Sequence, residues 1–185
     1  MFSALKSKYF LDYRYLLDQS TTYVETGLLA LGMTFVIVSG NIDLSVASML
    51  ALVACVSAKL MDAGWSIAAA SVAGLGLGVV LGGINGALVA KAKLPSFVVT
   101  LATMAIYRGI AQVLLGPNSV KLPASFAGVD MQYIPGHIPI PLLLLLGVAV
   151  VLGLTLHRSL YGRWVFAIGT NEVASFYSGI PVARV

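Results

Sequence analysis

The chain has 185 residues, of which 59% are apolar and only 10% charged, and its mean hydropathy is +0.96. A soluble domain carries about 25% charged residues, so this composition excludes a water-soluble globular protein and requires that several segments lie in lipid. The net charge of +4 is spread between apolar runs and forms no basic face for nucleic acid, and one Cys with two His residues provides neither a disulfide nor a metal cluster.

Residues 1–22 are predicted to lie at the membrane interface. Charged side chains interrupt this segment, and no apolar core of adequate length follows its first basic residues, so it is not a cleavable signal peptide. Tyr9, Tyr13 and Tyr15 give it the aromatic character that is enriched at membrane–water interfaces. We therefore expect an amphipathic segment that lies along the lipid surface.

Five apolar runs follow, and each is predicted to be a membrane helix. A bilayer core requires roughly 20 residues of α-helix, so the fold class predicted is an all-α polytopic membrane protein with about five transmembrane helices. A proline-containing stretch, residues 116–138, separates the last two runs and is predicted to be a loop. The runs cover residues 23–39, 44–61, 66–90, 95–115 and 140–156.

The first two runs are separated by residues 40–45, which read Gly-Asn-Ile-Asp-Leu-Ser. Irregular backbone at membrane depth is tolerated only where protein or a water-filled cavity surrounds it, and two short helices broken at a polar turn indicate a transport path. The alternative is a tight turn at the membrane surface, with Asp43 capping the next helix and Ser45 in its first turn. Both interpretations stay open from the sequence.

The third run carries a small residue at every fourth position, which places these residues on one face of a helix. Such a face lets a neighbouring helix approach closely, and van der Waals packing drives helix association in lipid. We interpret it as a packing face, with a direct role in binding a ligand as the alternative. The face consists of Ala70, Gly74, Gly78, Gly82, Gly86 and Ala90.

The fourth run carries a polar stripe. Its members are spaced so that they share one face of a helix. Hydrogen bonding between helices would explain this stripe, and the alternative is a polar wall of a substrate path. The stripe consists of Ser96, Thr100, Thr103 and Tyr107.

Charged residues fall inside the predicted membrane helices, among them Glu25 and Arg108. Arg108 lies beside the polar stripe, and an Arg at the centre of a membrane helix costs about 2.5–3.5 kcal/mol. It is therefore expected to find a carboxylate, helix carbonyls or water, and Glu25 in the first run is one candidate partner.

A short helix is predicted near residue 175. Thr170 or Asn171 is a good N-cap, Glu172 favours the first turn, and Gly179 followed by Pro181 is a stop signal. A helix of about two turns does not persist alone in water, so we expect it to dock on a cytoplasmic partner. A plain loop, or a connection to another membrane helix, is the alternative.

The basic residues of the loops predict the orientation. By the positive-inside rule, the set of alternate loops that is richer in Lys and Arg is cytoplasmic. The basic residues of the N-terminal segment then lie outside, which conflicts with the rule. The cytoplasmic set holds Lys91, Lys93, Arg158, Arg163 and Arg184, and the other holds Lys59 and Lys121.

Residues 30–46, 95–109 and 161–180 resemble one family. It is the family of permease subunits of bacterial sugar-importing ABC transporters, in the branch that includes ribose, rhamnose, galactose and autoinducer-2 importers. This chain departs from the family pattern at two positions, because the family usually has Gly in place of Asn41 and Ala47. Both departures add bulk at or beside the 40–45 turn.

The resemblance implies that the chain is a fragment of a larger helical bundle, multi-pass in the bacterial inner membrane. Residues 1–185 would form a single partial permease domain, with an interfacial segment (1–22), membrane helices (23–156) and a cytoplasmic coupling loop (157–185). A further helix before Met1 would resolve the conflict in orientation.

The resemblance also implies partners: a cytoplasmic ATPase subunit, a periplasmic sugar-binding protein and a second permease copy, besides the lipid bilayer. The chain would be no enzyme and would need no cofactor. It has no Walker-type motif, so ATP hydrolysis would reside in the partner chain. The residues expected to couple to the ATPase are Asn171, Glu172, Ala174, Ser178 and Gly179.

The implied function is import of a monosaccharide by alternating access. One alternative is a secondary transporter or channel driven by an ion gradient, in which Glu25, Asp43 and Arg108 would form a relay. Another is a membrane scaffold that transports nothing. A neutral sugar needs hydroxyl and amide partners, and the candidate path residues are Asp43, Ser45, Thr100, Thr103 and Tyr107.

Overall fold

The described part of the chain is mostly helical, as the sequence predicts. The computed structural model describes residues 12–116, 122, 126, 133–134 and 138–185. Within these residues the all-α prediction is confirmed, apart from one antiparallel pair of two-residue strands, β1 (Tyr133–Ile134) and β2 (Ile138–Pro139). The helices are α2 (Tyr13–Val38), α3 (Val46–Asp62), α4 (Ile67–Ala90), α5 (Ser96–Leu115), α6 (Ile140–Arg158), α7 (Leu160–Thr170), α8 (Glu172–Tyr177) and the 3-10 helix η3 (Val182–Arg184).

The five predicted membrane runs correspond to α2 through α6. Four of these helices, α2, α4, α5 and α6, are long and apolar enough to cross a membrane by length and composition. Helix α3 has 17 residues and spans only about 25 Å at 1.5 Å per residue, less than a hydrocarbon core of about 30 Å. The non-helical residues 41–45 lead directly into α3.

The first membrane helix begins earlier than predicted. Helix α2 starts at Tyr13, where Asp12 is the N-cap and accepts a hydrogen bond from the backbone N–H of Arg14, and it continues past residue 22 without a break. The predicted interfacial segment is thus helical over its described part. Residues 1–11 and most of the predicted loop 116–138 lie outside the described residues.

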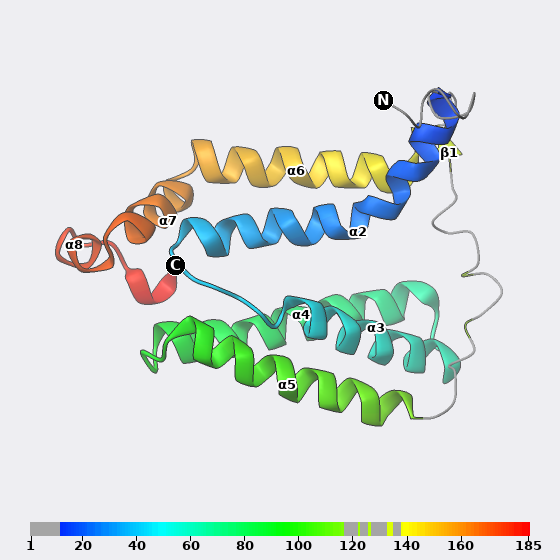
Figure 1. The fold of residues 1–185 in the computed structure, drawn as a ribbon, viewed down its shortest axis with the longest axis horizontal. Helices are drawn as coiled ribbons and strands as arrows, with labels where there is room; N and C mark the ends of the chain where they lie inside the picture. The colour runs from blue at the N-terminus through cyan, green and yellow to red at the C-terminus, as the bar shows by residue number, and fades with distance from the viewer. Residues whose placement is uncertain (1–11, 117–121, 123–125, 127–132, 135–137) are drawn as a thin grey trace, which may run out of the picture.

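The helices form two groups (Figure 1). Helices α3, α4 and α5 pack against one another, and α2 pairs with α6. Helix α7 contacts both α2 and α6 at one end of the molecule and leads into α8, while η3 contacts α8 and α4. The core of the first group is formed by Leu52, Leu81, Tyr107 and Ala111.

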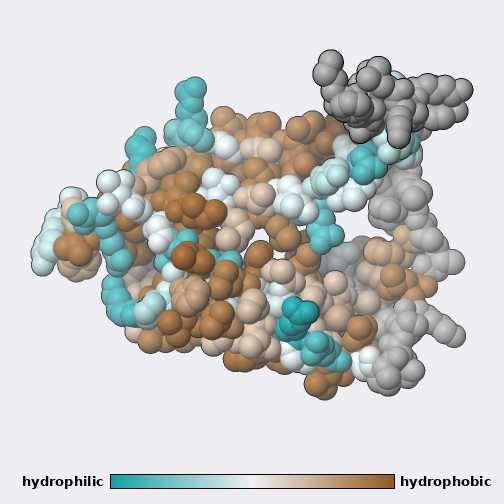
Figure 2. All heavy atoms as spheres, in the orientation of Figure 1, coloured by the Kyte–Doolittle hydropathy of each residue, from teal (hydrophilic) through white to brown (hydrophobic). Residues whose placement is uncertain are grey.

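The outer surface of the long helices is apolar. Figure 2 shows hydrophobic residues over much of α5 and α6. Val79 on α4 and Val113 on α5 are 76% and 82% exposed. Water disfavours such exposure of apolar side chains, whereas lipid does not, so the surface fits the multi-pass membrane protein that the sequence predicts.

The small-residue face of α4 has two different environments. A Cβ on Gly74 would overlap the Ser57 hydroxyl of α3, and a Cβ on Gly78 would still touch α3 at 3.9 Å. A Cβ on Gly82 or Gly86 would meet no atom within 4 Å in the described part of the chain. The first half of this face therefore packs on α3, and the second half borders open space.

Candidate functional site

The 40–45 turn lies beside the last turns of α4 and the first turns of α5. Its backbone meets the side chains of α5: the Ser96 hydroxyl accepts a hydrogen bond from the Ile42 N–H at 3.3 Å, and the Thr100 hydroxyl donates to the Ile42 carbonyl at 3.2 Å. Thr100 lies four residues into α5, or about 6 Å at 1.5 Å per residue. Protein groups thus satisfy irregular backbone below the helix ends, as lipid surroundings require.

A chain of hydrogen bonds links this turn to α4 and α5. Asp43 Oδ1 accepts hydrogen bonds from the N–H and the hydroxyl of Ser45, both at 2.7 Å. Asn85 Nδ2 on α4 donates to Ser45 Oγ at 2.8 Å, and the Tyr107 hydroxyl on α5 donates to Asn85 Oδ1 at 3.3 Å and to the Leu81 carbonyl at 3.2 Å. Ser45 is the N-cap residue of α3 and makes no side-chain capping hydrogen bond, so Asp43 does not cap the helix but holds Ser45, which Asn85 also bonds from α4.

Asn85 was not among the residues predicted from the sequence. It is buried at 5% exposure, and it is the one polar side chain between Ser71 and the end of α4. An amide within an otherwise apolar membrane run needs a hydrogen-bonding partner. That requirement is the signal in the sequence that marks Asn85 as a candidate residue.

The polar stripe of α5 faces α3 and α4. Thr100, Thr103 and Tyr107 are all buried. Thr103 donates only within its own helix, to the carbonyls of Val99 and Thr100 at 3.1 and 3.4 Å. Among the described residues no buried side-chain N or O atom lacks a hydrogen-bonding partner. Tyr107 is thus the member of the stripe that bonds to another helix, whereas Ser96 and Thr100 bond to the 40–45 turn and also border a cavity.

A cavity of about 920 Å³ opens beside the turn. It lies between the ends of α2, α4 and α5 on one side and α7, α8 and η3 on the other. Asp43 and Thr100 line it, whereas Ser45, Thr103 and Tyr107 do not. The open half of the α4 glycine face, Gly82 and Gly86, forms part of its wall. Its polar lining consists of Ser39, Asn41, Asp43, Asn85, Lys93, Ser96, Thr100, Thr170, Asn171 and Glu172.

The predicted C-terminal helix is present as α8. Asn171 is its N-cap and accepts a hydrogen bond from the Ala174 N–H at 2.9 Å, and Gly179 adopts a left-handed φ of +83° just after Ser178. Glu172 forms an ion pair with Lys93 at 3.6 Å, between two largely exposed side chains. The helix also exposes Val173, Phe176 and Tyr177, which were not among the predicted site residues.

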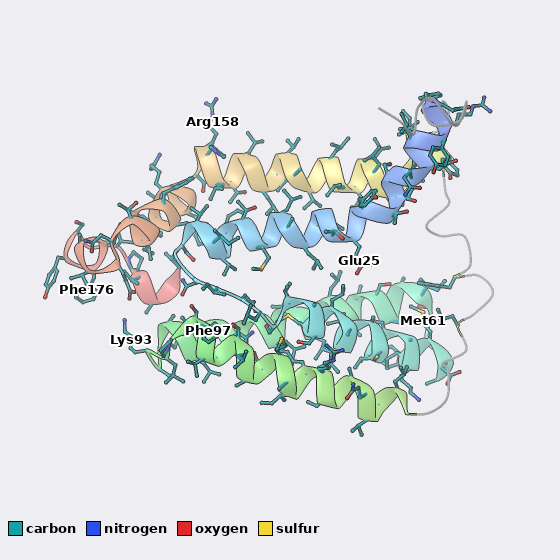
Figure 3. All side chains as sticks on the ribbon, in the orientation of Figure 1. Glu25, Met61, Lys93, Phe97, Arg158 and Phe176 are labelled. Atoms are coloured by element: carbon teal, nitrogen blue, oxygen red, sulfur yellow. The ribbon has the colours of Figure 1, made fainter. Side chains whose placement is uncertain are left out.

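The intramembrane charges Arg108 and Glu25 do not meet. Both are exposed, and the ion pair between Lys93 and Glu172 is the one recorded among the described residues. Figure 3 shows Glu25 pointing from α2 toward the side of α3–α5. The expected pairing of Glu25 with Arg108 is therefore wrong for this arrangement, and the relay that would join both to Asp43 is not assembled.

The chain matches the model of a protein family described as "Branched-chain amino acid transport system / permease component", over residues 15–185. It belongs to this permease family. The resemblance to ABC permeases that the 40–45 turn and the two later stretches indicate is thus confirmed. No solved structure matches the permease.

Curated relatives include permeases named for ribose, D-allose and autoinducer 2. The ribose import permease of Bacillus subtilis is 39% identical over 162 residues, which cover 86% of this chain and 50% of the relative. The D-allose transport system permease of Escherichia coli is 39% identical over 184 residues, covering 98% and 56%. The autoinducer 2 import permease of Shigella flexneri is 38% identical over 168 residues, covering 88% and 49%. The permease described here spans about half the length of these relatives.

Proposed function

We propose that the permease forms part of the membrane path of an ABC importer for a monosaccharide, in the bacterial inner membrane. The named relatives import ribose, allose and autoinducer 2, which supports a small polyol as substrate. A separate ATPase subunit would supply the energy, a periplasmic sugar-binding protein would deliver the sugar, and a second permease copy would complete the path. The chain itself would carry out no enzymatic step.

The observation that carries this proposal is the cavity beside the turn. Its volume of about 920 Å³ falls within the usual range of small-molecule sites. Most of its polar lining is neutral, with hydroxyl groups from Ser39, Ser96 and Thr100 and amides from Asn41 and Asn85. Such groups donate and accept hydrogen bonds with sugar hydroxyls, and the charged residues Asp43, Lys93 and Glu172 complete the polar lining. Gly82 and Gly86 keep that wall free of bulky side chains.

The cavity is proposed to be the cytoplasmic end of the path. It borders the loop that carries Lys93, and Figure 3 shows Arg158 and Lys93 at the same end of the molecule. The positive-inside rule assigns basic loops to the cytoplasm. Helix α8 lies at this end as well, where a cytoplasmic ATPase could reach it. The cavity would then be the exit through which the sugar leaves toward the cytoplasm.

Transport by reconstituted proteoliposomes tests this function. The full-length permease, its ATPase and its sugar-binding protein are assembled, and uptake of labelled ribose, allose and arabinose is measured with and without ATP. Uptake that requires both ATP and the ATPase supports the proposal, and Thr100→Ala should lower it. Uptake that an ion gradient drives without the ATPase would contradict it.

A further inference from the structure

Helix α7 rests directly on the backbone of two membrane helices. Its glycines Gly162 and Gly169 are seven residues apart, about two turns, and so lie on one face of α7. A Cβ on Gly162 would overlap the Leu156 carbonyl oxygen at the end of α6. A Cβ on Gly169 would overlap the Val38 carbonyl oxygen at the end of α2 and lie 2.9 Å from the Val38 carbonyl carbon.

The contact at Gly169 adjoins the start of the 40–45 turn. A Cβ on Gly40 would lie 3.6 Å from Gly169 Cα and 3.7 Å from the Gly169 carbonyl oxygen. Gly40 has a left-handed φ of +81°, so the chain reverses direction at this contact. Backbone touches backbone here, without flexible side chains between the two segments.

The same helix is joined closely to α8. Asn171 is the single residue between α7 and α8, and it belongs to both helices: its N–H donates to the Ala167 carbonyl at 3.0 Å, and its side chain caps α8. A displacement of α8 therefore moves the end of α7 that carries Gly169. Close-packed contacts transmit such displacements because they have little free volume to absorb them.

The far side of the turn is held by α4 and α5. Ile42 is bonded through both its N–H and its carbonyl to α5, and Ser45 is bonded to Asn85 on α4. We propose that residues 39–45 transmit movement of α8 to α4 and α5, and that Gly169 is the positioning residue at the joint. This inference rests on the proposed function, since an ATPase partner is what would move α8.

Besides this joint, α8 is connected to the α3–α5 group by η3, which contacts α8 and α4, and by an ion pair that is too weak to replace the joint. The ion pair of Lys93 with Glu172 joins two side chains that are 68% and 60% exposed. Exposed ion pairs contribute about 0–1 kcal/mol and hold no fixed geometry. Lys93→Gln is therefore a suitable control, because it removes this pair and leaves the contact between Gly169 and Val38 in place.

Hydrogen exchange measured by mass spectrometry tests the inference on the full-length permease bound to its ATPase in nanodiscs. A non-hydrolysable ATP analogue is added, and exchange is followed in α8, in residues 41–45 and in residues 81–90 of α4. In the wild type all three segments should change together. In Gly169→Ala the change in α8 should persist while the change at 41–45 is lost. Lys93→Gln should keep the coupled exchange changes in α8 and at 41–45, and Gly153→Ala, where a Cβ meets nothing within 4 Å, should behave as wild type.

Two results would refute the role of Gly169 and leave the proposed function unaffected. One is that hydrogen exchange in the wild type changes in α8 but not at 41–45. The other is that Gly169→Ala shows the same exchange changes as the wild type. Absence of any change in α8, together with uptake that does not need ATP, would overturn the proposed function and the joint with it. If Gly169→Ala does not fold, Asn85→Ala gives the second test. That variant should keep the change at 41–45 and lose it at 81–90, and an unchanged response at 81–90 would overturn the inference.

Discussion

Asn85→Ala should destabilise the permease by removing the pin between α4 and the turn. The substitution removes two hydrogen bonds, one to Ser45 Oγ at 2.8 Å and one from Tyr107 at 3.3 Å. Hydrogen bonds between membrane helices contribute about 0.6 kcal/mol on average and up to about 1.7 kcal/mol. The bond to Ser45 is short and buried, so it belongs near the upper value. The bond from Tyr107 is long, and Tyr107 also donates to the Leu81 carbonyl, so it belongs below the average.

Double-mutant cycles separate these two contributions. Unfolding of the purified full-length permease is titrated with SDS in mixed micelles for Asn85→Ala, Ser45→Ala, Tyr107→Phe and the two double variants. We expect a coupling free energy of about 1–1.5 kcal/mol between Asn85 and Ser45, and of at most about 0.5 kcal/mol between Asn85 and Tyr107. The total loss in Asn85→Ala should then be about 1.5–2 kcal/mol, roughly a factor of 10–30 in the unfolding equilibrium.

The test compares the coupling free energy of Asn85 with Ser45 and the coupling free energy of Asn85 with Tyr107. Independent sites add to within about 0.3–0.5 kcal/mol. A coupling between Asn85 and Ser45 inside that limit would refute the conclusion that Asn85 holds the turn. A coupling to Tyr107 larger than that to Ser45 would mean that Asn85 joins α4 to α5 and not to the turn.

Two further predictions concern α7 and α8. Gly162→Ala should lower the yield of folded permease, and it should lower the free energy of unfolding by more than about 2 kcal/mol, because a Cβ would overlap the Leu156 carbonyl oxygen. Gly153→Ala in α6 is the control, because a Cβ there meets open space. In the same SDS titration it should be neutral or stabilising by up to about 1 kcal/mol. Phe176→Ala and Tyr177→Ala should weaken co-purification of the ATPase while leaving the unfolding free energy within about 0.5 kcal/mol, since both side chains are exposed on α8; unchanged co-purification would exclude this face as the docking surface.

Features that depend on local sequence were predictable. Helix α8 forms where Asn171 can cap it and where Gly179 can end it, and both signals lie within one short stretch. The stripe of α5 faces its neighbours because helical periodicity alone places Thr100 and Tyr107 on one side. The five apolar runs follow from hydropathy, which measures the preference of each segment for lipid.

Features that depend on distant contacts were not predictable from one sequence. Asn85 and Ser45 are 40 residues apart, and neither residue type specifies the other as its partner. Helix α7 was not predicted, and its contacts at Gly162 and Gly169 depend on how α2 and α6 end in space. Arg108 and Glu25 suggested a pair by charge, but they lie on separate helix groups, and charge alone carries no information on that separation.

The shortness of α3 has a consequence for the permeability of the membrane at this protein. A bilayer resists polar solutes through the thickness of its insulating hydrocarbon, which is about 30 Å. Helix α3 covers only about 25 Å of it, and the polar cavity reaches Asp43, next to the start of α3. On the proposed path, a solute that enters from the end carrying Lys93 would meet polar lining residues as far as Asp43. The rest of the barrier would then lie along the apolar length of α3, so we expect a movement of this helix to change permeation more than an equal movement at the cavity mouth.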